Sequence, residues 1–120
     1  MNKKTEALMK TLTTELRLTE NVAVIHSASE DTPRTVAFIS MDKSLSVKEK
    51  LEKAFMLTNS IEDAWYTSDK VNYIGPEKSC RSTTVGDFVL IGKTKYECKP
   101  AGWSKVAYPD PGAAHERNLG

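Results

Sequence analysis

A chain of 120 residues and 13.3 kDa has the size of one domain and is long enough to bury a hydrophobic core without disulfides. Its 39% hydrophobic and 28% charged residues are typical of a globular protein and exclude a largely disordered chain. With 17 basic against 16 acidic residues, the net charge of +1 lacks the strong positive bias of a dedicated duplex-DNA binder.

The cysteines and the hydropathy pattern indicate a compartment. Cys80 and Cys98 are too few for a disulfide framework and form no Cys-x-x-Cys pair, which favours a reducing environment. The basic N-terminus precedes no apolar signal-peptide core, and no uncharged apolar stretch reaches the roughly 18 residues of a membrane helix. We therefore expect a soluble, cytoplasmic protein that has no membrane partner.

The first half of the chain predicts a helix, a hairpin and a second helix. Leucines recur every fourth residue in 3–18, which predicts an amphipathic helix, and the β-branched runs 22–26 and 35–41 predict two antiparallel strands. Ser46 and Glu49 match a capping box, which predicts a helix from Val47 to about residue 58. The expected inward stripe of this helix is Val47, Leu51, Ala54 and Phe55.

The middle of the chain predicts shorter elements. Residues 60–66 are compatible with one further helical turn, in which Ile61 and Trp65, four residues apart, face the core together. A weak strand pattern at 71–74 ends at Gly75 and Pro76.

The C-terminal third predicts a β-hairpin. A turn at Gly86 and Asp87 precedes the apolar strand 88–92, and residues 93–99 alternate, with Lys93, Lys95, Glu97 and Lys99 on the wet face and Thr94, Tyr96 and Cys98 on the inner face. Residues 103–106 predict a short additional strand. The expected fold class is α+β, with an antiparallel sheet of about four strands packed against one or two helices. The domain is expected to span 1–107, followed by a disordered tail at 108–120.

No arrangement of residues predicts catalysis, a metal or a cofactor. His26 with either cysteine is the only pair that suggests a thiol nucleophile or metal site, and a core histidine and a small buried cysteine explain these residues better. Glu62 and Asp63 are adjacent and would point apart, so they do not form an acid/base pair. We therefore predict a protein that is not an enzyme.

Residues 81–87 form a polar loop with two interpretations. Arg81 and the neighbouring hydroxyls could hold a phosphate or carboxylate, or Arg81 could pair with Asp87 and latch the loop shut. The latch is favoured, since the glycine spacing of a phosphate-binding loop is absent.

Basic side chains concentrate in residues 78–105, which contain six lysines and arginines but only two acidic residues. Such a surface with a nearby aromatic side chain suits a protein partner or single-stranded nucleic acid, although lysines also keep an exposed sheet soluble. The predicted binding residues are Arg81, Lys93, Lys95, Lys99, Trp103 and Lys105.

The segment from Arg81 to Trp103 resembles a group of small phage-type proteins. These carry Arg-Ser-x-Ser-Val-Gly-Asp, an apolar strand, a strand ending in Tyr-x-Cys, and Gly-Trp or Gly-Phe. The matching residues are Arg81, Ser82, Val85, Gly86, Asp87, Tyr96, Cys98, Gly102 and Trp103, and Thr84 replaces the second serine. The resemblance implies a phage or mobile-element accessory protein of unassigned activity. The leading hypothesis is therefore a binding module for a host protein, and the alternative is a module for single-stranded nucleic acid.

Overall fold

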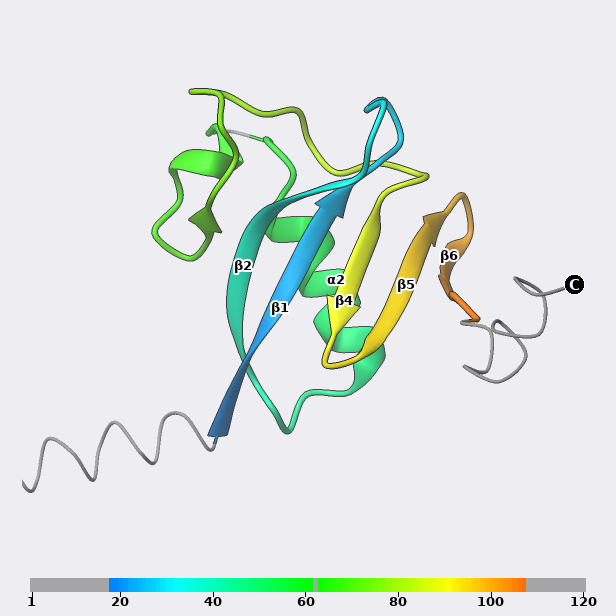
Figure 1. Cartoon of the computed structure of the whole chain (residues 1–120). Helices are drawn as coiled ribbons and strands as arrows, with labels where there is room; N and C mark the ends of the chain where they lie inside the picture. Colours follow the sequence, from blue (N-terminus) through cyan, green and yellow to red (C-terminus); the bar gives the residue numbers. More distant parts are fainter. Residues whose placement is uncertain (1–17, 62, 108–120) are drawn as a thin grey trace, which may run out of the picture.

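The computed structural model describes residues 18–61 and 63–107. The predicted helical segment up to residue 17 and the predicted tail at 108–120 lie outside the described residues, as does Glu62. Within the described part, one antiparallel sheet packs against one α-helix, so the α+β prediction is confirmed (Figure 1).

The sheet has six strands in the described part of the chain, in the order β3-β2-β1-β4-β5-β6. Four of them correspond to the predicted strands: β1 (Thr19–His26), β2 (Arg34–Asp42), β4 (Phe88–Ile91) and β5 (Thr94–Lys99). The predicted sheet of about four strands is extended at its two edges by β3 (Asn72–Tyr73) and β6 (Gly102–Lys105), which pair with β2 and β5. Both edge strands correspond to the short strand patterns in the sequence.

The helix α2 (Val47–Leu57) lies behind the sheet, against β1 and β4 (Figure 1). Its capping box is confirmed, because the Ser46 hydroxyl accepts from the Glu49 N–H at 3.1 Å and the Glu49 carboxylate accepts from the Ser46 N–H at 3.0 Å. The predicted inward stripe is only half right. Leu51 and Ala54 are buried, whereas Val47 and Phe55 are 42% and 36% exposed.

The helical turn predicted at 60–66 is replaced by a 3₁₀ helix, η1 (Trp65–Thr67). Trp65 is 3% exposed and belongs to the core, whereas Ile61 is 83% exposed, so the prediction that both face inward was wrong for Ile61. The spacing of four residues aligns two side chains only inside a continuous α-helix, and Ile61 precedes η1. η1 packs against β3, beside the sheet.

The two faces of the sheet follow from its register, because directly opposed residues of antiparallel strands point to the same side. Val22 of β1 opposes Ile39 of β2 and Ile91 of β4, and Val24 opposes Ala37 and Val89. All six residues are buried in the core on the α2 side, so we call this the helix face. The residues between them point to the opposite side, the open face, which no element of the described chain covers (Figure 1).

Candidate functional site

Asp87 is the buried anchor of the loop that leads into β4. Its side chain is fully buried, and Oδ1 accepts from the N–H groups of Ser27 and Ala28 at 2.8 and 3.0 Å. Oδ2 accepts from the Thr84 N–H at 2.8 Å. Hydrogen bonds to the charged form outweigh burial and hold the pKa of Asp87 at about 2. The carboxylate thus ties the β1–β2 loop to the loop that precedes β4.

Arg81 closes this loop and has no donor left for a ligand. Its Nη1 and Nη2 atoms donate to the Asp87 carboxylate at 2.7 and 2.8 Å, and its Nε and Nη2 atoms donate to Glu30 at 3.1 and 2.8 Å. The remaining N–H of Nη1 points to the Ser82 carbonyl at 3.0 Å. Because all five N–H groups have acceptors, Arg81 acts as the predicted latch and is not available as an anion-binding residue. The sequence did not reveal Glu30, which comes from a distant loop.

A chain of hydrogen bonds sets the protonation of the buried His26. Thr58 Oγ1 donates to the Ala54 carbonyl at 2.7 Å, so the contact of 2.7 Å between Thr58 and Thr83 uses the Thr83 proton. Thr83 Oγ1 then accepts from His26 Nε2 at 3.0 Å, which leaves Nδ1 to accept from the Cys80 thiol at 3.6 Å. These contacts place a proton on Nε2, and burial, which lowers the pKa of His26, favours the neutral form of the ring.

The contact between Cys80 and His26 is that of an uncharged pair. Burial raises the pKa of the Cys80 thiol and lowers the pKa of His26, and the latter effect exceeds the opposing influence of Asp87. A catalytic cysteine needs the reverse, a thiolate beside an imidazolium. The directions of both pKa shifts therefore favour a structural role for Cys80 and His26.

We expect the fold to lose stability when His26 is protonated. Because the pKa of His26 is lowered from 6.5, its contribution is fully present above pH 6.5 and declines as the pH falls through 6.5 towards the folded-state pKa. The free energy of unfolding should decline by at most about 1.4 kcal/mol per pH unit in this range. Urea denaturation between about pH 7.5 and about pH 5 measures it, and the His26→Gln variant should show a flatter dependence. An equal slope in both proteins would contradict this assignment.

The structure divides the predicted basic surface between two faces. Tyr96 and Cys98 point to the helix face and Lys95 to the open face, so the predicted alternation of this strand is confirmed. Trp103, however, opposes Cys98, and Lys105 opposes Tyr96, so both of these point to the helix face. The alternation within β5 could not reveal this, because it contains no information about how β6 is registered.

Trp103 and Lys105 border a groove between α2 and the edge strand. The groove has a volume of about 560 Å³. Its lining residues are Val47, Lys48, Leu51, Glu52, Tyr96, Ala101, Gly102, Trp103 and Lys105. Trp103 is half-buried and meets Phe55 edge to face at 6.2 Å. The exposed Val47 thus lines a groove, which explains why it departs from the predicted inward stripe.

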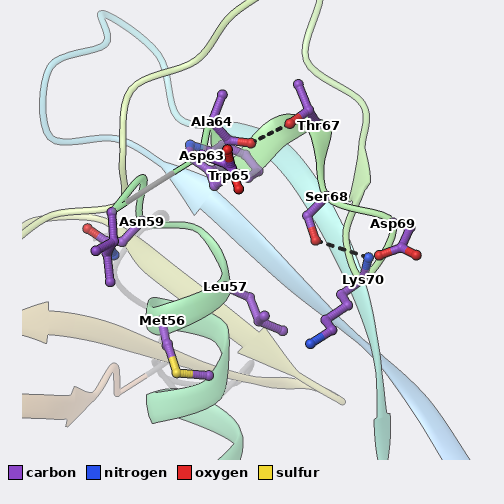
Figure 2. Close-up of a pocket in the computed structure, with 11 residues that line it drawn as sticks. Met56, Leu57, Asn59, Asp63, Ala64, Trp65, Thr67, Ser68, Asp69 and Lys70 are labelled. Carbon is purple, nitrogen blue, oxygen red and sulfur yellow. Dashed lines mark hydrogen bonds between the residues drawn. The ribbon is translucent and has the colours of Figure 1, made fainter.

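A second hollow, of about 790 Å³, lies between the end of α2 and residues 63–70 (Figure 2). Met56 and Leu57 form the α2 side and Trp65 forms part of the opposite wall. At the rim of this hollow, the Thr67 hydroxyl donates a hydrogen bond to the Ala64 carbonyl at 2.7 Å. None of the predicted binding residues lines this hollow.

Comparisons with known proteins identify no relative: no family model, curated protein or solved structure matches the chain. Within residues 18–61 and 63–107, no cluster of three or more histidine, cysteine, aspartate or glutamate side chains could hold a metal ion. No helix of this described part is long and apolar enough to cross a membrane.

Proposed function

We propose that this protein is a small non-enzymatic binding module that holds a segment of another protein in the groove beside Trp103. The observation that carries the proposal is an apolar groove next to the edge strand β6. Val47, which is 42% exposed, and the half-buried Trp103 supply apolar surface, and half-buried tryptophans concentrate binding energy at interfaces.

The edge of the sheet suggests how the partner binds. β6 is the last strand of the sheet in the described chain, so an extended segment can pair with its outer edge and place alternate side chains over the groove. Lys48 and Lys105 line the groove against the single acidic Glu52, which favours a partner segment that combines apolar and acidic residues. The phage-type resemblance makes a host protein in the cytoplasm the expected partner.

Affinity capture from bacterial lysate tests the proposal. The wild-type protein should retain one partner in near-stoichiometric amount, and Trp103→Ala should weaken its binding about 30-fold or more, as expected for a hot-spot residue. Lys105→Glu should also weaken binding, whereas Lys53→Glu on the exposed side of α2 is the matched control. Thermal melts verify that each variant is folded. Retention of no partner, or equal retention by Trp103→Ala, would overturn the proposal.

A further inference from the structure

The open face of the sheet has an apolar and partly aromatic centre. Phe38 of β2 opposes Ala23 of β1, which opposes Leu90 of β4, and Ile25 opposes Phe88. Ala23 is buried and the other four are partly exposed. The two rings lie on strands that flank β1, so they are separated by one strand across the face.

Hydrogen-bonding side chains surround a hollow beside Phe38. The hollow has a volume of about 380 Å³ and is lined by Asn21, Phe38, Ser40, Asp69, Lys70, Val71 and Asn72. Three polar side chains of this set are exposed, and each can both donate and accept hydrogen bonds: Asn21 on β1, Ser40 on β2 and Asn72 on β3. Nucleobase edges also present donors and acceptors side by side. An aromatic ring beside such groups is therefore suited to holding a base.

Lysines border the other side of this face. Lys95 on β5 opposes Leu90, and its Nζ atom lies 4.1 Å from the centre of the Phe88 ring. Lys93 lies in the preceding turn and is exposed. The one acidic side chain of β5, Glu97, is paired with Lys99 at 2.9 Å. On the β3 side, Lys70 lines the hollow next to Asp69, so a lysine is present at both borders and the excess of positive charge lies at the β5 border.

We propose that the open face binds single-stranded nucleic acid. Bases stack on Phe38 and, when Lys95 moves from above the ring to a phosphate, on Phe88. The side chains of Asn21 and Asn72 form hydrogen bonds to a base edge, and the bordering lysines contact phosphates. A single strand is required because only unstacked bases can lie flat on aromatic side chains of a sheet. This activity is independent of the protein-binding groove, which lies on the opposite face of the sheet.

Fluorescence anisotropy with labelled oligo-dT and oligo-U of about 15 nucleotides tests this inference on the full chain. We expect binding at about 50 mM salt that weakens roughly 20-fold at about 200 mM, if Lys70, Lys93 and Lys95 each neutralise one phosphate. Phe38→Leu and Phe88→Leu keep the apolar bulk and remove the stacking surface, so each should weaken binding about 5-fold or more. Lys95→Gln should reduce the salt dependence.

The matched control is Trp103→Ala, which should bind the oligonucleotides as tightly as the wild type while it loses the protein partner. Equal losses in Trp103→Ala and Phe38→Leu would overturn the assignment to the open face. No anisotropy change at low salt, or unchanged affinity in both leucine variants, would overturn the proposal. Sedimentation would show whether the protein forms a stable dimer that the oligonucleotide does not dissociate. If it does, and the oligonucleotide affinity is unchanged in both leucine variants, the open face binds a second copy of the chain.

Discussion

Asp87→Asn is expected to destabilise the fold by about 3–5 kcal/mol, because it leaves the Arg81 guanidinium without its buried counter-charge. The carboxylate accepts five hydrogen bonds, three from backbone N–H groups and two from Arg81. An asparagine amide in the same position turns one N–H donor towards other donors, so at least one of these bonds is replaced by repulsion. Urea denaturation at neutral pH measures the loss.

Glu30→Gln is the matched control for this substitution. Glu30 contacts the same guanidinium, but its side chain is 17% exposed, whereas that of Asp87 is fully buried. Water can therefore compensate the lost charge, and we expect a cost of about 1 kcal/mol. If Asp87→Asn is no more costly than Glu30→Gln, the buried ion pair does not hold this loop.

The same carboxylate should contribute to acid sensitivity. The pKa of Asp87 is lowered from 3.8 to about 2, so its contribution is present above pH 3.8 and is lost as the pH falls towards 2. The loss that involves His26 begins at a higher pH, near 6.5, because the pKa of His26 is lowered from that value. Lowering the pH should therefore weaken the contacts of His26 before those of Asp87.

Local patterns predicted the elements of this fold well. The capping box at Ser46 and the alternation in residues 93–99 each depend on neighbours within a few residues, and the structure contains both. The proposed pairing of Arg81 with Asp87 was also local, since the two residues are six positions apart. Such features are predictable because the chain itself brings the groups together.

The remaining features depend on contacts between distant segments. Glu30 reaches Arg81 across 51 positions, and His26 reaches Thr83 across 57 positions. The register of β6 placed Trp103 and Lys105 on the helix face, whereas Lys95 points to the open face. Phe38 and Phe88 could not be recognised as one surface until β1 was placed between β2 and β4. The sequence therefore indicated a basic aromatic surface without showing that it comprises two separate faces.

Trp65→Ala is expected to cost about 3–5 kcal/mol, the range for truncation of a buried aromatic side chain. Trp65 is 3% exposed and meets Tyr73 and His26 edge to face at 5.5 and 6.2 Å. Its Nε1 atom also donates to the Arg81 carbonyl at 2.9 Å, so truncation removes the partner of a carbonyl in the loop 81–87, the latch loop. Equilibrium denaturation should show the loss, and Trp65→Phe should recover part of it.

Ile61→Ala is the decisive comparison, because the spacing in the sequence placed Ile61 in the core beside Trp65. In the structure Ile61 is 83% exposed, so its truncation should change the free energy of unfolding by no more than about 0.5 kcal/mol. A large loss in Ile61→Ala would mean that residues 60–66 form the continuous helical turn predicted by the sequence. A small loss in Trp65→Ala would mean that the segment holding η1 contributes little to the stability of the sheet. Since Trp65 joins η1, β3 and the latch loop, we expect its removal to loosen all three together.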